Sequence, residues 1–284
     1  MMLLKRNQID DHKWNSCIEN SFNPRIYGLT WYLDSVCDDW LGIIGQNYDF
    51  VFPVPIYKKW SLFPWIGQPP FCQQLGIFSH QPIDYQSIFN KLKGYPKIQL
   101  NFMPSPFLKH LPTKRNSLLY LENNYELLSS QYSTLRKREL KKAKKNNFVC
   151  FCNHDIEKSL DFWVSQWQKK SFYHKKWNKI LINLVQNSKN YNRLHFISVY
   201  KENKMVGVGL FIEDFERIIY LGGTFIENNS NSMIFDYIIK KFANKIKYLD
   251  FEGSSLPGVQ QFYESWGKLE YEYYHIWNFK ILPF

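Results

Sequence analysis

Apolar runs mark two sets of three strands along the chain. Each run is rich in β-branched and aromatic residues, and short polar turns separate the runs, which is the pattern of an antiparallel meander. The first set comprises WLGIIGQ (40–46), YDFVFPVPIY (48–57) and SLFPWIG (61–67). The second set comprises RLHFISVY (193–200), KMVGVGLFI (204–212) and RIIYLGG (217–223). The two sets predict a unit that is repeated at an offset of about 150 residues.

A segment with helical periodicity and a further strand follow each set. These pairs are DYQSIFNKLKG (84–94) with KIQLNFMPS (97–105), and NSMIFDYIIKKFANK (231–245) with KYLDFEGSS (247–255). Asn and Ser residues at the start of the second helix are expected to cap it. Each half also opens with two helical segments. The order predicts a mixed α/β fold duplicated in tandem, with each half a mixed sheet flanked by helices and with halves at 1–125 and 126–284.

Composition supports a folded chain with an excess of positive charge. The 284 residues are 45% hydrophobic and 18% aromatic but only 21% charged, so the chain has enough apolar surface for a packed core. Lys and Arg number 36 against 25 Asp and Glu, a formal net charge of +11. This excess favours an anionic partner such as nucleic acid, a phosphorylated cofactor or a membrane surface.

Three segments add local motifs to this order of elements. They are PWIGQPPFCQQLGIF (64–78), SLLYLENNYELLSSQYSTLRKRELKKAKKNNF (117–148) and YLDFEGSSLPGVQQFYESWG (248–267). The order of elements resembles the GNAT acyltransferase fold. The tandem pair with these motifs resembles the FemABX-like aminoacyltransferases and related double-GNAT proteins. The resemblance implies a transferase that moves an acyl or aminoacyl group to an amine acceptor.

The start of the second helix departs from the GNAT pattern. GNAT enzymes hold the coenzyme A pyrophosphate on the backbone amides of a glycine-rich loop at a helix N-terminus. The corresponding segment here is TFIENNSNSMIF, which contains no glycine. Within it, Asn229, Ser230, Asn231 and Ser232 form the cofactor-loop region. No tightly bound cofactor is therefore expected, and acyl-coenzyme A or aminoacyl-tRNA would serve as donor substrate.

A basic segment, TLRKRELKKAKKNN (134–147), joins the two halves. On a helix, its cations would attract the phosphates of tRNA, another RNA, a lipid headgroup or coenzyme A. An equally weighted interpretation is a solvated helix. Arg136 differs from the others because it falls on the apolar stripe, where a cation is normally paired or functional. The candidate donor-binding residues are Arg136, Arg138, Lys141, Lys142 and Lys145.

The segment DFEGSS (250–255) supplies candidate catalytic carboxylates. In a strand, Asp250 and Glu252 would lie on one face. Acyl transfer to an amine needs a base that deprotonates the ammonium and donors that stabilise the oxyanion. Glu252 is the first candidate for the base and Asp250 the second; the alternative is a structural carboxylate beside the next helix. Tyr263 on that helix lies where many GNAT enzymes place the tyrosine that protonates the leaving group.

The cysteines and histidines show no spacing typical of a metal site. The five cysteines are scattered and are expected to be reduced, mostly buried thiols. No run of roughly 18 apolar residues occurs, and the start MMLLKRNQIDDHKW lacks the apolar core of a signal peptide. No metal site and no transmembrane segment are predicted, and a cytoplasmic location is expected.

The sequence therefore predicts a GNAT-type transferase of acyl or aminoacyl groups. Two alternatives stay open at this level. One is an acetyl-coenzyme A-dependent N-acetyltransferase with an atypical pyrophosphate loop. The other is a catalytically silent GNAT-like module that binds RNA or an acidic partner through the 134–147 helix.

Overall fold

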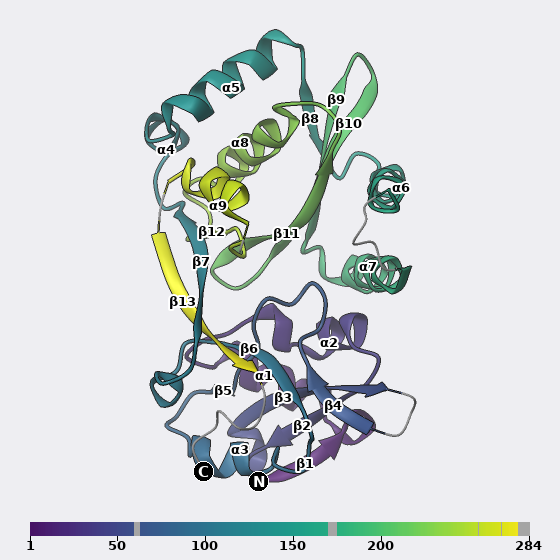
Figure 1. The fold of residues 1–284 in the computed structure, drawn as a ribbon, viewed down its shortest axis with the longest axis vertical. Helices are drawn as coiled ribbons and strands as arrows, with labels where there is room; N and C mark the ends of the chain where they lie inside the picture. The colour runs from purple at the N-terminus through teal and green to yellow at the C-terminus, as the bar shows by residue number, and fades with distance from the viewer. Residues whose placement is uncertain (60–62, 170–174, 255, 268, 278–284) are drawn as a thin grey trace. The chain divides into compact units, whose positions relative to one another are not determined.

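The computed structural model describes all residues except 60–62, 170–174, 255, 268 and 278–284 (Figure 1). The strands are β1 Met2–Lys5, β2 Trp40–Ile44, β3 Phe50–Lys59, β4 Phe63–Gly67, β5 Phe78–Ser79, β6 Ile98–Phe102, β7 Thr113–Tyr120, β8 Val149–Cys152, β9 Leu194–Lys201, β10 Lys204–Glu213, β11 Arg217–Phe225, β12 Tyr248–Asp250 and β13 Leu269–Trp277. The α-helices are α1 Asp11–Glu19, α2 Thr30–Val36, α3 Tyr85–Asn90, α4 Tyr125–Ser130, α5 Thr134–Lys145, α6 Ile156–Trp167, α7 Lys175–Ser188, α8 Ser230–Phe242 and α9 Pro257–Glu264. In the described part of the chain, no helix combines the length and the apolar character needed to cross a membrane.

The chain divides into two compact units. Unit 1 comprises residues 1–114, 183–188 and 272–284, and unit 2 comprises 115–182 and 189–271. Both units therefore contain segments from distant parts of the sequence. The predicted boundary of the repeats at residues 125 and 126 stays a prediction about the duplication, because the compact units do not follow chain order alone.

The sheet of unit 1 has the strand order β1-β2-β3-β4-β6-β13. Strands β2, β3 and β4 form the antiparallel meander that the first apolar set predicts. Strand β6 runs parallel to β4, with Ile98 opposite Ile66, and β13 runs antiparallel to β6. Strand β5 pairs with β3 beside this path.

The sheet of unit 2 repeats this topology in the order β8-β9-β10-β11-β12-β7. Strands β9, β10 and β11 form the second antiparallel meander. Strand β12 runs parallel to β11, with Leu249 opposite Ile218, and β7 runs antiparallel to β12. The sequence prediction of a duplicated mixed sheet is confirmed strand by strand.

The sixth strand of each sheet comes from the other half of the chain. Strand β7 follows β6 in sequence but completes the sheet of unit 2. The C-terminal part of β13, Glu272–Trp277, completes the sheet of unit 1, where Ile276 lies opposite Leu100. The two repeats thus exchange their last strands, which the hydrophobic pattern alone does not reveal.

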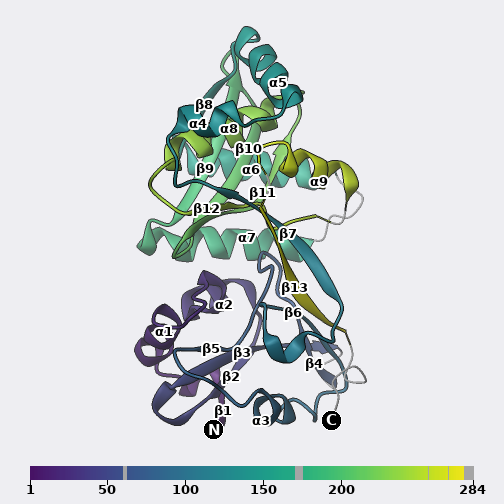
Figure 2. The same cartoon turned by 90° about the vertical axis from the view of Figure 1, so that its left-hand side faces the viewer.

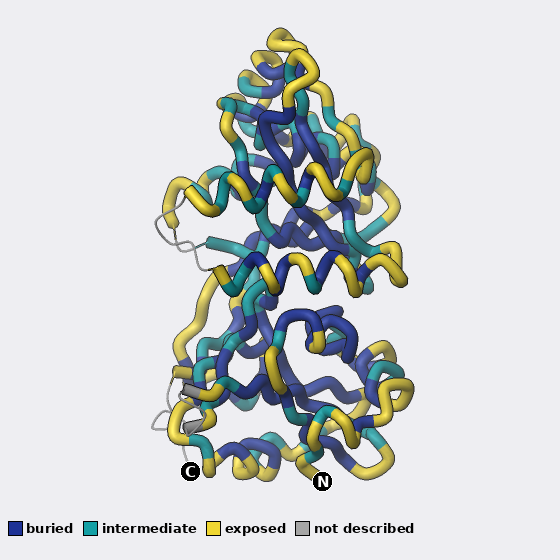
Figure 3. The backbone as a smooth tube through the Cα atoms, turned by 90° about the vertical axis from the view of Figure 1, so that its right-hand side faces the viewer, coloured by how far each residue is buried: buried dark blue, intermediate teal, exposed yellow. Residues whose placement is uncertain are grey.

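Helices cover both faces of the unit 2 sheet. Helix α8 lies on one face, and α6 and α7 lie on the other (Figure 1). Figure 3 shows the central strands in dark blue, which marks them as buried. The residues of α8 that are fully buried against the sheet are Ile234, Phe235, Ile238, Ile239 and Phe242. Burial of each such apolar side chain contributes about 1.5–3 kcal/mol to the stability of the folded state. These side chains therefore fix α8 on the sheet.

Candidate functional site

Strands β11 and β12 part after a short stretch of parallel pairing. Only Arg217–Ile219 of β11 pair with β12, whereas β11 continues to Phe225. Its register with β10 also shifts, because Leu210 pairs with Gly222 but Phe211 pairs with Tyr220. Leu221 thus forms a β-bulge just beyond the last pair with β12. Bulges of this kind commonly lie next to active sites, where they redirect backbone groups.

Asp250 closes the end of β12 through a buried ion pair. Its Oδ2 accepts a hydrogen bond from Arg217 at 2.6 Å, and its Oδ1 accepts one from Asn116 Nδ2 at 2.8 Å. The backbone N–H of Glu252 also donates to Asp250 Oδ1 at 2.9 Å. These three contacts give Asp250 a structural role in fixing the end of the strand. Its role as a catalytic carboxylate stays a prediction.

Glu252 lies just past the end of β12, in a turn. The expected strand over 247–255 is wrong at its C-terminal end, because Glu252 and Gly253 both adopt left-handed backbone conformations with φ of 60° and 61°. A Cβ at Gly253 would lie 2.4 Å from the backbone oxygen of Arg115, so this close approach requires glycine. The alternation that would place Asp250 and Glu252 on one strand face therefore ends at Asp250.

The Glu252 side chain has the chemistry of a base that works near neutral pH. Burial raises the pKa of its carboxyl group from 4.5 to about 8. Helix α9 has Leu256 as its N-cap residue and no side-chain hydrogen bond at that cap in the described residues, so the structure gives no support for a helix-capping carboxylate. A strained turn and a strongly shifted carboxyl group together are typical of functional sites.

Tyr263 of α9 lies beside this carboxylate. Its ring stacks on Phe251 with the centroids 4.9 Å apart, and its side chain is buried. Burial, followed by the charge of Glu252, raises the pKa of the Tyr263 hydroxyl, so Tyr263 keeps its proton at neutral pH. The structure therefore brings together two of the predicted residues, Glu252 and Tyr263.

The raised pKa of Glu252 predicts a pH-dependent stability. Between pH 4.5 and about 8 the folded protein keeps a proton on Glu252 that the unfolded chain releases. The stability that Glu252 contributes is therefore complete below pH 4.5 and is lost as the pH rises through about 8. We expect Glu252→Gln to remove this dependence. Urea unfolding of both proteins at about pH 5 and about pH 8 measures it. An equal difference between the two proteins at both pH values would contradict the prediction.

Arg136 joins α5 to the start of α8 and to the end of α9. It is buried, and its guanidinium donates to Ser232 Oγ of α8 at 2.6 Å, to Ser265 Oγ after α9 at 3.0 Å, and to Glu139. It also lies 4.2 Å over the ring of Phe262. The expectation that a cation on the apolar stripe is paired or functional is met by pairing. Its direct contact with a donor stays a prediction.

The start of α8 is built from side chains rather than from glycine. Asn229 is the N-cap residue with φ of 70° and makes no side-chain capping bond, so the expected cap from this residue is wrong. Ser230 Oγ donates to the Glu227 carbonyl at 2.6 Å, and the Ser232 N–H donates to Asn231 Oδ1 at 2.8 Å. In addition, Ser232 Oγ donates to Glu139 Oε2 at 2.7 Å. A carboxylate therefore lies at the helix end where GNAT enzymes bind pyrophosphate.

The other predicted cations lie on the outer surface of α5. Arg138, Lys141, Lys142 and Lys145 are all exposed. Figure 2 shows α5 in front of α8. The structure thus separates these cations from the buried Arg136. They form an exposed basic face that is open to a polyanion, and their role in binding stays a prediction.

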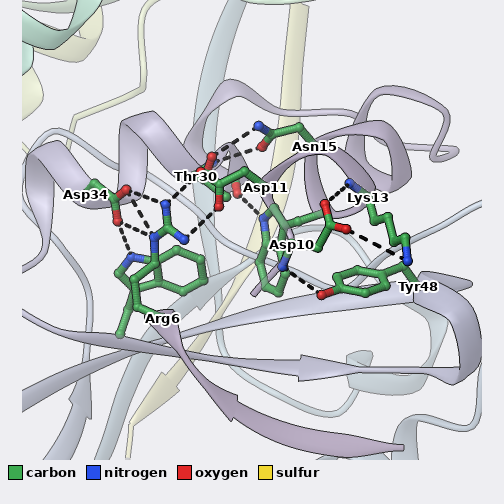
Figure 4. Close-up of polar contacts among 11 residues, drawn as sticks. Arg6, Asp10, Asp11, Lys13, Asn15, Thr30, Asp34 and Tyr48 are labelled. Atoms are coloured by element: carbon green, nitrogen blue, oxygen red, sulfur yellow. Dashed lines mark hydrogen bonds and ion pairs between the residues drawn. The ribbon is translucent and has the colours of Figure 1, made fainter. Parts of the chain in front are cut away.

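Unit 1 contains a pocket of about 790 Å³. Four of its charged groups are already in ion pairs. Arg6 binds Asp11 and Asp34 at 2.7 and 2.8 Å (Figure 4), and Lys58 lies 3.5 Å from Asp39. The hydrogen bonds that Arg6 donates to Asp34 raise the pKa of the Arg6 guanidinium, which stays charged. Asp34 and Asp39 in this pocket are held by cations, whereas the strand end in unit 2 brings Glu252 and Tyr263 together, so that strand end is the better candidate for acyl transfer.

Comparison with known proteins gives matches at the level of structure. Neither a family model nor a curated protein sequence matches the chain. The solved structure of FemX matches 97% of this chain and 98% of its own chain, with a TM-score of 0.67 and 11% identity. A tandem GNAT protein from the clavulanic acid biosynthesis pathway covers 97% of each chain, with a TM-score of 0.56 and 9% identity. The chain has a tandem GNAT fold. L-PGS from Bacillus licheniformis is also similar, with a TM-score of 0.60 and 9% identity over 95% of this chain and 92% of its own.

Sequence reasoning missed several residues of this tandem GNAT fold that surround the bulge. Gly222 has φ of 147°, and a Cβ there would lie 3.1 Å from Trp163 Cη2. Trp163 is fully buried, and within the described residues its indole nitrogen has no hydrogen-bond partner. The adjacent glycines in RIIYLGGTF were the available signal, because glycine inside a strand marks a bulge or a close approach.

Proposed function

We propose that unit 2 transfers an acyl or aminoacyl group from a donor to an amine, with Glu252 as the general base. The observation that carries the proposal is the Glu252 carboxyl group, which lies where β11 and β12 part and whose pKa burial raises to about 8. A base with this pKa can remove a proton from an ammonium group near neutral pH. The tandem GNAT fold, whose family transfers acyl groups to amines, supports the same reaction class.

In the proposed reaction the amine attacks the carbonyl carbon of the donor. Glu252 takes the proton from the ammonium, a C–N bond forms, and the bond from the carbonyl carbon to the oxygen or sulfur of the leaving group breaks. Tyr263, which keeps its proton because burial raises its pKa, gives that proton to the leaving group and receives the second proton that the nitrogen loses as the amide forms. Backbone N–H groups at the Leu221 bulge would stabilise the oxyanion.

The electrostatics of unit 2 favour a polyanionic donor over free coenzyme A. Glu139 is hydrogen-bonded to Ser232 in the first turn of α8 and is paired with Arg136, so the polar groups at that end of the helix already have partners. The exposed cations of α5, by contrast, are suited to the repeated phosphates of an aminoacyl-tRNA. We therefore propose aminoacyl-tRNA as the donor class, with acetyl-coenzyme A as the alternative.

An amide-forming assay tests this function. The full-length protein is incubated with bulk tRNA charged with radiolabelled amino acids, or with acetyl-coenzyme A, and with a mixture of primary amines. We expect labelled amides from the charged tRNA, and we expect Glu252→Gln to lower their rate of formation by about 10²-fold or more. Product from acetyl-coenzyme A alone would favour the alternative donor. Absence of product from both donors with folded protein would contradict the proposal.

Coenzyme A is expected to bind weakly. Because the start of α8 lacks glycine and Ser232 there is already bonded to Glu139 of α5, a pyrophosphate meets fewer open donors. We expect a dissociation constant of about 0.1 mM or weaker, which corresponds to about −5.5 kcal/mol. Titration calorimetry measures this constant. A value of about 1 μM would contradict the prediction and support the acetyl-coenzyme A alternative.

A further inference from the structure

A thiol, an imidazole and a carboxylate lie in series across three adjacent strands of unit 2. Cys152 Sγ of β8 is 3.7 Å from His195 Nδ1 of β9. His195 Nε2 is in turn 2.5 Å from Glu213 Oε1 at the end of β10. A nucleophile within reach of a base that a third group orients is the arrangement by which proteins activate thiols and hydroxyls.

The sheet register places these three side chains together. Cys152 lies opposite Ile197 on β9, and His195 is two residues earlier on β9, so both side chains lie on the same face. Asn153 fixes this end of β8 to β9, because its Nδ2 donates to the Leu194 carbonyl at 3.1 Å and its Oδ1 accepts from the Phe196 N–H at 2.8 Å. The ring of His195 packs edge-on against Phe242 of α8, with the centroids 5.3 Å apart. The imidazole is thus held by packing as well as by hydrogen bonds.

The protonation states suit general-base activation. Burial lowers the pKa of His195, so the imidazole is neutral near pH 7. The hydrogen bond to Glu213 assigns the single ring proton to Nε2, which leaves the Nδ1 lone pair directed at the thiol. Burial raises the pKa of Cys152, whereas Lys241 of α8, which hydrogen-bonds the thiol, acts in the opposite direction. Tyr237 of α8 is a further titratable group that interacts with both Cys152 and Cys150.

We propose that Cys152 is a nucleophilic thiol that accepts an acyl group from a small thioester, with His195 as its base and Glu213 as the residue that positions the base. His195 takes the thiol proton while the sulfur attacks the thioester carbonyl. A new S–C bond to Cys152 forms, the C–S bond of the donor breaks, and His195 returns the proton to the departing thiolate. The reaction exchanges one thioester for another and needs no oxidant or reductant. It uses none of the residues of the proposed function on β12 and α9.

Cys150 provides an internal comparison. It lies two residues before Cys152 on the same face of β8 and is half-buried in the same way. Burial raises the pKa of Cys150 to about 12, and no histidine contact is recorded for it in the described part of the chain. Among the described contacts, the two thiols therefore differ in the His195–Glu213 pair and in the hydrogen bond with Lys241, both of which belong to Cys152.

Acetylation of the full-length protein with S-acetyl-N-acetylcysteamine tests this proposal. This small thioester lacks a nucleotide, so the result does not depend on donor binding at α8 or α5. Peptide mass mapping gives the rate of acetylation at each cysteine, and release of the group by neutral hydroxylamine identifies a thioester. We expect Cys152 to react at least about tenfold faster than Cys150, with Cys150→Ala leaving the Cys152 rate unchanged.

Variants of the two partner residues separate activation from structure. We expect His195→Gln to lower the Cys152 rate by about 10²-fold, the scale of lost general-base catalysis. Glu213→Gln should move the pH–rate midpoint to lower pH, because Glu213 raises the pKa of His195. Equal acetylation of both cysteines in the wild-type protein, no acetylation at Cys152, or an unchanged rate in folded His195→Gln would each overturn the proposal.

Discussion

Replacing Glu252 with Gln is expected to lower the turnover of acyl transfer by about 10²-fold or more. The amide cannot accept the ammonium proton, while its size and polarity preserve the turn after β12. In the wild-type protein kcat/KM should rise with pH and level off above about 8, because burial raises the pKa of Glu252 to that value and only the carboxylate acts as a base. The variant should lack this rising limb. Initial rates of amide formation across the pH range measure both effects.

A matched surface change controls for the loss of negative charge. Glu216 is exposed and lies 3.8 Å from Lys247 in the same unit. Glu216→Gln should therefore keep both the rate and the pH profile of the wild-type protein. Wild-type activity in a folded Glu252→Gln protein would show that Glu252 is not the base.

Replacing Asp250 with Ala is expected to destabilise unit 2 by about 3–5 kcal/mol. The change leaves the guanidinium of Arg217 buried without its partner at 2.6 Å and also removes the acceptor for Asn116. Replacing both charges, as Arg217→Met with Asp250→Leu, should recover only part of this loss, because the buried Asp214, which lies 3.9 Å from Arg217, then loses its own cation. Equilibrium unfolding in urea gives the free energy of unfolding of the wild-type protein, the single variant and the double variant.

An exposed ion pair gives the comparison for Asp250. Asp39 of unit 1 lies 3.5 Å from Lys58, and both side chains are about half exposed. Asp39→Ala should change the free energy of unfolding by less than about 1 kcal/mol. If Asp250→Ala behaves like Asp39→Ala and lowers activity instead, then Asp250 acts in catalysis and its structural role is minor.

The sequence predicts the strands and helices well because their signals are local. Apolar periodicity identifies both meanders and the helix α8, and it gives the repeat that the two sheets confirm. The end of β12 is different. The left-handed conformation of Glu252 depends on the close approach of Gly253 to Arg115, more than 130 residues away along the chain, and a strand pattern cannot encode such a contact.

In the candidate site, too, local motifs could be predicted and long-range contacts could not. Glu252 and Tyr263 could be selected because short motifs around them resemble those of a known fold. The partner of Asp250 could not, because Arg217 is separated from it by 33 residues and meets it only through parallel pairing of β11 and β12. Glu139 was visible only as the single acid in a basic segment, and its contact with Ser232 depends on how α5 lies against α8.

The shared last strands bear on how the protein is synthesised and on how its gene can be divided. The nascent chain completes the first unit only when Glu272–Trp277 has left the ribosome, so β6 keeps an unpaired edge until that segment has been synthesised. A gene cut between the repeats would encode one fragment with β7 but without β12, and another with β13 but without β6. Neither fragment can satisfy the backbone of its own sheet. Each repeat therefore needs the last strand of the other, and we expect the two repeats to fold only when both are present.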